Sequence, residues 1–183
     1  MGRQRAPKYT TGKHTRKYLR VVNVLDGYFS FTDVEEMDFD DRDYPKYNLK
    51  KDDLLLTEGD IVSTYNVGRC AIWNEEIPDC CFQNTLIRFQ SGPSILPKFA
   101  YYLFRAAFYK GVFAGASNMT TVAHLGSTRF SKIKLGVPSI DEQLQIIETL
   151  DSVSSVCDNL RLKGKTRSQL DSTLRNSILE GVQ

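Results

Sequence analysis

A chain of 183 residues with 41% hydrophobic residues and a net charge of +2 is long enough for one domain with a core and one appendage. It has no run of about eighteen apolar residues and no apolar segment after its basic N-terminus, which excludes a membrane-spanning helix and a secretory signal. Its four cysteines form no C-x-x-C pair and only two histidines are present, so we expect a cytoplasmic protein with reduced thiols and no metal site.

Charge is unevenly distributed along the first sixty residues. The first twenty contain no acid and seven bases: Arg3, Arg5, Lys8, Lys13, Arg16, Lys17 and Arg20. Residues 26–60 then carry twelve acids against four bases. A basic arm beside an acidic segment can orient a protein on a polyanion such as DNA; a solvated terminus beside a solvated acidic face is the alternative.

Short β-prone segments follow the arm. They are residues 18–24, 28–31, 54–57, 68–73 and 85–89. The first two flank Asp26-Gly27 and predict a hairpin. The acidic segment 32–48 predicts a loop with one helical turn. Five short strands separated by turn residues favour an antiparallel, barrel-like sheet.

Helical spacing begins near Pro97. The apolar stripe that predicts a helix ending near Gly111 consists of Phe99, Tyr102, Leu103, Ala106 and Tyr109. A polar loop over residues 115–127 and a last short strand over residues 133–137 follow. The predicted fold is therefore α+β, with a small β-rich domain and packed helices over residues 1–138.

A long helix is predicted over residues 139–183. Ser139 and Glu142 form a capping-box pair, and no proline follows before Glu180. The apolar seam that we expect to pair with another helix contains Leu144, Ile147, Leu150, Val153, Cys157, Leu160, Leu170, Leu174 and Ile178. Folding back on the domain is the alternative, but about forty helical residues span about 60 Å, which is longer than a small domain is wide.

The residue types favour nucleic-acid binding over catalysis. The sequence has no phosphate-binding glycine motif and no nucleophile elbow, so we predict no catalytic residues. Basic side chains interleaved with Tyr, Thr, His and Asn suit phosphates and base edges. The candidate DNA-binding residues are Arg3, Arg5, Lys8, Tyr9, Lys13, His14, Arg16, Lys17, Arg69, Asn118, Thr120, Thr121, His124, Arg129 and Lys132. The candidates in the loop over residues 115–127, which are Asn118, Thr120, Thr121 and His124, could instead pack against the sheet.

Several motifs resemble those of specificity subunits of type I restriction-modification systems. Residues 17–24 resemble a "YLR-x-x-N-V" strand, and residues 49–55 resemble "L-x-x-G-D-I-L", with Lys51 and Asp52 around the usual glycine. Other matching segments are residues 67–71, residues 83–88, the string Pro-x-x-x-Glu-Gln-x-x-Ile from Pro138 to Ile146, and a "LL-x-x-G" ending at residues 178–181.

The resemblance implies one target recognition domain and one spacer helix, which is a half-length specificity subunit whose N-terminal segment is shortened. Such a subunit is not an enzyme. It would bind double-stranded DNA and direct methyltransferase and restriction subunits, which bind S-adenosylmethionine, ATP and Mg, to a bipartite target. Its helix would pair with a second copy or with another specificity chain. The alternatives are the recognition part of a fused restriction–methyltransferase enzyme and a helical protein-interaction adaptor.

Overall fold

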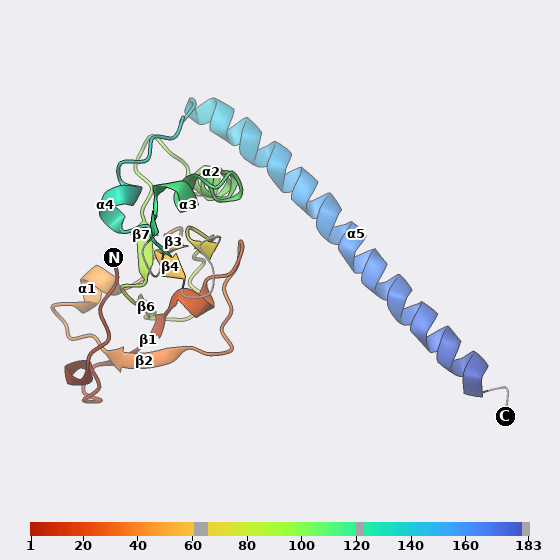
Figure 1. The fold of residues 1–183 in the computed structure, drawn as a ribbon, viewed down its shortest axis with the longest axis horizontal. Helices are drawn as coiled ribbons and strands as arrows, with labels where there is room; N and C mark the ends of the chain where they lie inside the picture. Colours follow the sequence, from red (N-terminus) through yellow and green to blue (C-terminus); the bar gives the residue numbers. More distant parts are fainter. Residues whose placement is uncertain (61–65, 120–122, 181–183) are drawn as a thin grey trace. The chain divides into compact units, whose positions relative to one another are not determined.

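The computed structural model describes residues 1–60, 66–119 and 123–180 (Figure 1). The chain forms two compact units, residues 1–143 and residues 144–183, and the first contains every described strand. None of the described helices is long and apolar enough to span a bilayer. The division into two domains after residue 138 stays a prediction.

The first unit combines short strands with short helices. The strands are β1 (Thr15–Leu19), β2 (Glu35–Asp38), β3 (Leu54–Thr57), β4 (Gly59–Asp60), β5 (Cys70–Ile72), β6 (Cys81–Phe82), β7 (Leu86–Phe89), β8 (Asn118–Met119) and β9 (Ala123–His124). Its helices are α1 (Tyr44–Tyr47), α2 (Pro97–Tyr109), α3 (Val112–Ala116) and α4 (Ser127–Phe130), with 3-10 turns at Pro7–Tyr9 and Val21–Asn23. The long helix α5 (Ile140–Glu180) begins in this unit and forms most of the second.

Three separate sheets replace the single barrel-like sheet that the sequence predicts. β3 lies between β5 and β7, and β9 lies between β4 and β8, with antiparallel pairing throughout. β1 pairs antiparallel with β2 and parallel with β6. The α+β class is confirmed, but the barrel is wrong for the described part of the chain. Closure needs strands long enough to stagger around a ring, and these strands have two to five residues.

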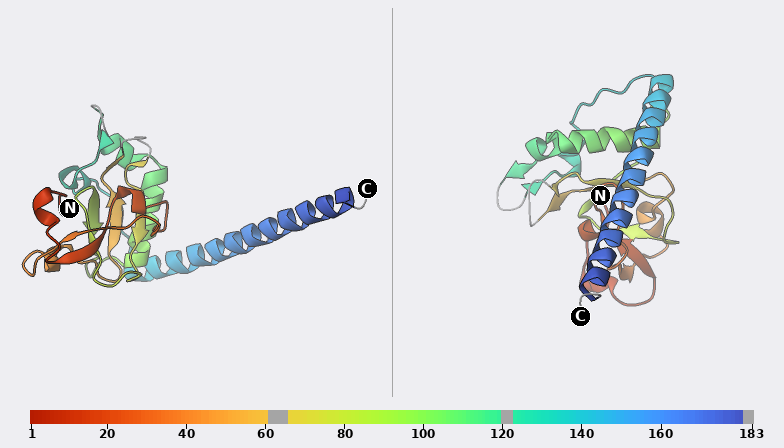
Figure 2. Two further views of the ribbon diagram at one scale, coloured as in Figure 1. Left: turned by 90° about the horizontal axis from the view of Figure 1, so that it is seen from below. Right: turned by 90° about the vertical axis from the view of Figure 1, so that its right-hand side faces the viewer.

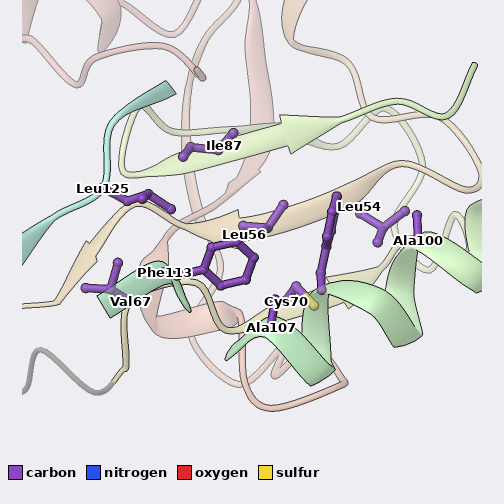
Figure 3. Packing of buried hydrophobic residues seen from close by; sticks show 10 residues of the cluster. Leu54, Leu56, Val67, Cys70, Ile87, Ala100, Ala107, Phe113 and Leu125 are labelled. Atoms are coloured by element: carbon purple, nitrogen blue, oxygen red, sulfur yellow. The ribbon is translucent and has the colours of Figure 1, made fainter. Parts of the chain in front are cut away.

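The hydrophobic core lies on both faces of β3. Leu54 and Leu56 pack with Ala100 on one side (Figure 3), whereas Leu55 packs with Trp73 on the other. Successive side chains of a strand point to opposite faces, so a strand covered on both faces must be apolar at each position. This explains the continuous Leu-Leu-Leu run and confirms the buried strand predicted at residues 54–57.

Helix α2 covers one of these faces, and the N-terminal segment lies on the other side of the strands (Figure 2, left). The predicted helix is confirmed, with Pro97 in its first turn and Gly111 in the left-handed region just beyond it at φ 72°. Its buried residues are Phe99, Ala100, Phe104 and Ala107. The predicted stripe is therefore confirmed at Phe99 and at Leu103, which packs against the core, but it is wrong at Ala106 and Tyr109, which are exposed.

Three local predictions differ from the structure. The hairpin is reduced to a turn at Gly27 closed by one bridge between Val24 and Phe29. The acidic segment contains the predicted helical turn, α1, but also strand β2, which pairs with β1. Residues 133–137 form no strand; Ile133 and Leu135 pack on the core from an irregular segment, which produces the alternating pattern without a partner strand.

The predicted capping box at the start of α5 is confirmed. Ser139 N donates to Glu142 Oε2 over 2.9 Å, and Glu142 N donates to Ser139 Oγ over 3.4 Å. The hydrogen bonds from Ser139 lower the pKa of the Glu142 carboxyl. The two side chains satisfy backbone groups that a helix otherwise leaves unpaired, so α5 begins at a defined residue.

Gln143, the next residue, is fully buried and fixes this first turn to the domain. Its side-chain oxygen accepts from Leu96 N over 2.8 Å, and its amide nitrogen donates to Ser94 O and Pro138 O over 3.0 and 2.9 Å. Each of these contacts is made to a backbone group. The side chain therefore ties together the end of the irregular segment, the turn before α2 and the start of α5.

Replacing Gln143 by Leu removes all three hydrogen bonds while keeping a similar volume. We expect a loss of about 2–4 kcal/mol in the free energy of unfolding, because buried backbone groups lose their partners. Urea unfolding followed by circular dichroism measures this change. Gln145→Leu, at an exposed position of the same helix, is the control and should change stability by less than about 0.5 kcal/mol. Equal losses in the two variants would contradict the role of Gln143.

Candidate nucleic-acid interface

The N-terminal segment is docked on the domain. Arg3 N donates to Phe82 O over 3.0 Å, and Asn84 N donates to Arg3 O over the same distance. A Cβ at Gly2 would lie 2.3 Å from Phe82 O, so only glycine allows this close approach. The predicted basic arm thus begins as an extension of the sheet edge at β6.

Arg3 is part of the fold. It is 4% exposed, its guanidinium lies 3.9 Å from the centre of the Tyr9 ring and 5.2 Å from that of Phe39, and it donates to Asp38 O over 2.5 Å. It also forms an ion pair with the Asp43 carboxylate. A buried arginine needs such a set of partners, and with them it joins the arm to β2 and to the segment before α1.

Asp38, at the end of β2, organises the next part of the arm. Its carboxylate accepts from Thr11 N and Oγ1 over 2.6 Å each, from Gly12 N over 3.1 Å and from His14 N over 3.0 Å. The hydrogen bond from the Thr11 hydroxyl, helped by those backbone donors and opposed by burial, lowers the pKa of Asp38 to about 2. The loop that presents Lys13 and His14 is therefore held by one ionised side chain.

The contribution of Asp38 to stability should depend on pH. Its pKa in the folded protein is about 2, below the ordinary value of 3.8, so the contribution is present above that ordinary value and is lost as pH falls towards about 2. Asp38→Asn should destabilise the protein near neutral pH, and the difference from the unsubstituted chain should shrink between about pH 4 and about pH 2. Urea unfolding at several pH values tests this. Asp41→Asn, at an exposed position, is the control, and a difference for Asp38→Asn that does not vary with pH would contradict the mechanism.

The acidic segment neutralises part of the arm. Arg5 lies 3.2 Å from Glu35, and Arg20 lies 2.7 Å from both Asp33 and Glu35. The interpretation of these acids as a solvated face is wrong for Glu35, Asp38 and Asp43, which pair with or hold the arm, whereas Asp33 is 72% exposed although it pairs with Arg20. The exposed candidates that remain on the arm are Lys8, Lys13, His14 and Lys17.

Two further arm candidates are half-buried against aromatic rings. The Tyr9 ring contacts both the Arg3 guanidinium and the Lys8 ammonium, the latter 4.9 Å from the ring centre. Arg16 lies 5.2 Å from the centre of the Tyr44 ring and donates to Thr15 O over 3.0 Å. These contacts hold cationic groups at the surface at little entropic cost, which suits contact with a phosphate backbone.

The second group of candidates lies on and beside α4. His124 and Arg129 are exposed, with Arg129 Nη1 donating to His124 O over 3.3 Å, and Lys132 is exposed just beyond the helix. Phe130 anchors α4 by packing against Phe104, with ring centres 5.5 Å apart. The interpretation of this segment as a free loop is wrong where it forms β9, which pairs with β4.

The other candidates are placed only in part. Asn118 stands opposite His124 in the pairing of β8 with β9, and its side chain is outside the described part of the chain. Thr120 and Thr121 lie outside the described residues. Arg69 is half-buried immediately before β5.

The N-terminal segment connects the two groups of candidates. One open hollow is lined by residues that include Gly2, Lys8, Tyr9 and Arg42. A second is lined by residues that include Met1, Glu58, Arg129 and Lys132. Since Met1 and Gly2 are consecutive, the hollows adjoin, and Figure 1 shows the N-terminus between α1 and α4. The structure thus brings together candidates that are more than one hundred residues apart in the sequence.

Sequence reasoning missed Arg42 and Glu58 as members of this surface. Arg42 is surrounded by acids in the sequence, which hid it, and Glu58 follows a buried strand as an ordinary turn residue would. No local pattern distinguishes either residue. Both are found only from the path of the N-terminal segment across β6, β7 and α4.

The structure offers little for metal or thiol chemistry. Within the ranges that it describes, no group of three His, Cys, Asp or Glu side chains could hold a metal ion. Burial raises the pKa of the Cys70, Cys80 and Cys81 thiols to about 12, so they stay protonated and unreactive.

Comparison with known families gives one clear match. The family described as type I restriction modification DNA specificity domain matches residues 26–167, which cover most of the first unit and the first part of α5. No curated protein sequence matches the chain.

Two solved structures share the fold at low identity. One, from a study of complex assembly and conformational transition of the type I R-M system, has a TM-score of 0.66 at 14% identity, over 93% of this chain and 39% of that chain. The other, the type I restriction-modification system S subunit from M. genitalium, has a TM-score of 0.53 at 16% identity, over 87% of this chain and 37% of that chain. The chain therefore spans less than two-fifths of the length of either solved chain.

Proposed function

Because the chain belongs to the family of type I restriction modification DNA specificity domains, we propose that it is a specificity subunit that reads one half of a bipartite DNA site. The match of this family to residues 26–167 is the observation that carries the proposal. In this role the protein performs no chemistry. Methyltransferase and restriction subunits would bind S-adenosylmethionine, ATP and Mg and would be directed to the target by this chain.

The distribution of charge supports contact between DNA and the surface formed by the N-terminal segment and α4. Acids pair with Arg3, Arg5 and Arg20, which leaves Lys8, Lys13 and Lys17 as exposed cations held on an ordered arm. Each lysine that neutralises a phosphate releases a counterion and makes affinity depend on salt. The arm would set the register on the duplex, and residues near α4 would contact bases.

Replacing Lys8, Lys13 and Lys17 together by Ala tests this use of the arm. We expect weaker binding to all duplexes and a plot of log affinity against log salt that is less steep by up to about 2.7, since each phosphate contact contributes about 0.9. Fluorescence anisotropy with labelled duplexes over a range of salt concentrations measures the slope.

The control variant carries the same change of charge elsewhere. Lys50, Lys51 and Lys110 are exposed and lie outside the arm and α4, so their replacement by Ala should leave the slope nearly unchanged. An equal loss of slope in both triple variants would contradict the assignment to the arm. Failure of the unsubstituted chain to bind any duplex, alone or with methyltransferase subunits, would contradict the proposed function and favour a protein-interaction adaptor.

We also propose that α5 pairs antiparallel with α5 of a second copy, forming a coiled coil. The helix has 41 residues, and its seam is open to water at Leu144, Val153 and Leu160, which are 52%, 54% and 62% exposed. Burying such a seam against an identical one removes apolar surface from water and gives two-fold symmetry. A dimer of this kind would recognise a palindromic bipartite site with a fixed spacer. The side chains of Leu170, Leu174 and Ile178, also predicted in the seam, are outside the described part of the chain.

Replacing Leu150 and Leu160 by Glu should abolish this pairing, because it places charges in the apolar seam. Sedimentation velocity at tens of micromolar should give a dimer for the unsubstituted chain and a folded monomer for the variant. The control, Gln145→Glu with Ser152→Glu, changes exposed positions on the opposite side of the helix and should remain dimeric. A monomeric unsubstituted chain would contradict the homodimer and would favour a non-identical specificity chain as the partner.

A further inference from the structure

We infer that Glu58 is a specificity-determining residue whose carboxylate accepts a hydrogen bond from the N4 amino group of a cytosine in the major groove. The inference rests on the proposed function, since it assigns a base contact to the surface beside α4. Nothing in the sequence marks Glu58 for this role. The geometry of the hollow between the N-terminal segment and α4 carries the inference.

The backbone at Glu58 is held on both sides. Glu58 N donates to Thr85 O over 2.9 Å, and Leu125 N donates to Glu58 O over 2.8 Å. The residue lies between β3, which is buried at each of its positions, and β4, which pairs with β9. A side chain on such a backbone is presented from a rigid support, which a base-reading group needs.

The side chain of Glu58 lies half-buried in an open hollow. The hollow is also lined by Met1, Gly126, Thr128, Arg129 and Lys132. A Cβ added at Gly126, which has φ 62°, would lie 3.9 Å from Glu58 Oε1, so the carboxylate lies close beside this glycine. Within the described part of the chain, no hydrogen bond or ion pair reaches this carboxylate. Burial raises its pKa, and the nearby His124 and the Met1 ammonium oppose the shift without a direct ion pair.

A half-buried carboxylate that accepts no hydrogen bond is costly unless a donor arrives with a ligand, even where cations lie nearby. The surrounding groups indicate which ligand. Arg129 and Lys132 are exposed cations that suit phosphates, and a carboxylate beside them would repel a phosphate but accept from an amino group at a base edge. Among the major-groove edges, the cytosine N4 amino group is the usual donor to Glu, whereas adenine pairs better with Asn or Gln. The hollow therefore favours cytosine.

Glu58→Gln tests the inference, because it removes the charge with almost no change of shape. A random-sequence duplex library is enriched for binding to the full chain and, in parallel, to this variant. The unsubstituted chain should enrich a site with cytosine on one strand at one position. In Glu58→Gln that preference should fall about tenfold or more, while the other positions are unchanged. Affinity for non-specific duplex should rise, since a negative charge beside Arg129 and Lys132 is lost.

Glu36→Gln is the matched control, because Glu36 is exposed on β2, and it should keep every base preference. Unchanged preferences in Glu58→Gln would overturn the assignment. So would a preference of the unsubstituted chain for adenine, and not cytosine, at the position where this variant loses its preference. A uniform loss at all positions together with a lower melting temperature would also overturn it, since it would mean that Glu58 supports the fold. If the unsubstituted chain enriches no sequence at all, the proposed function itself fails, and this outcome is distinct from the others.

Discussion

The double-sided burial of β3 is the constraint on which the rest of the domain depends. Leu54 and Leu56 close one core against α2, and Leu55 closes the other against the side that carries β1 and β6. Because both neighbours, β5 and β7, pair with β3, its backbone hydrogen bonds are satisfied without solvent. The chain leaves β3 directly into Glu58 and β4, so a strand that is buried at all four of its positions fixes where this part of the candidate interface lies.

Charge compensation turns the N-terminal segment from a flexible tail into a surface. Arg3 would be costly to bury alone, but Asp43 and the Tyr9 ring make its burial possible, and Asp38 then holds the loop at Thr11. The acidic segment therefore holds part of the basic arm in place on the domain. The small net charge of the chain conceals this division, in which some cations serve the fold and others remain exposed for a partner.

The sequence predicted best those features whose signal is local. The apolar run of β3, the start and end of α2 and the Ser139–Glu142 pair each depend on a few neighbouring residues, and all three are confirmed. The "L-x-x-G-D-I-L" resemblance also has a physical basis, because Asp52, near the usual glycine, has φ 69° in the left-handed region.

The features that the sequence did not reveal depend on residues far apart in the chain. Three of the four residues of strand β2 are acidic, and it is a strand because Asp38 and Glu35 meet the basic arm. Ile133 and Leu135 alternate with exposed residues as they would in a strand. They pack against the core, but no described strand pairs with this segment. The candidate interface is of the same kind, since Lys8 and Arg129 belong to one surface only because Gly2 allows the N-terminal segment to cross β6 and β7.

Glu142 and Gln143 divide the work at the start of α5. Glu142 caps the helix, and Gln143 binds the backbone of the domain at Leu96 and Ser94. Neither residue depends on the side chains of the helix beyond residue 143. The sequence of the helix beyond residue 143 can therefore vary while its first turn stays attached to residues 1–143. Because these polar contacts are made to backbone atoms, they leave the apolar seam of α5 free for the pairing that we propose.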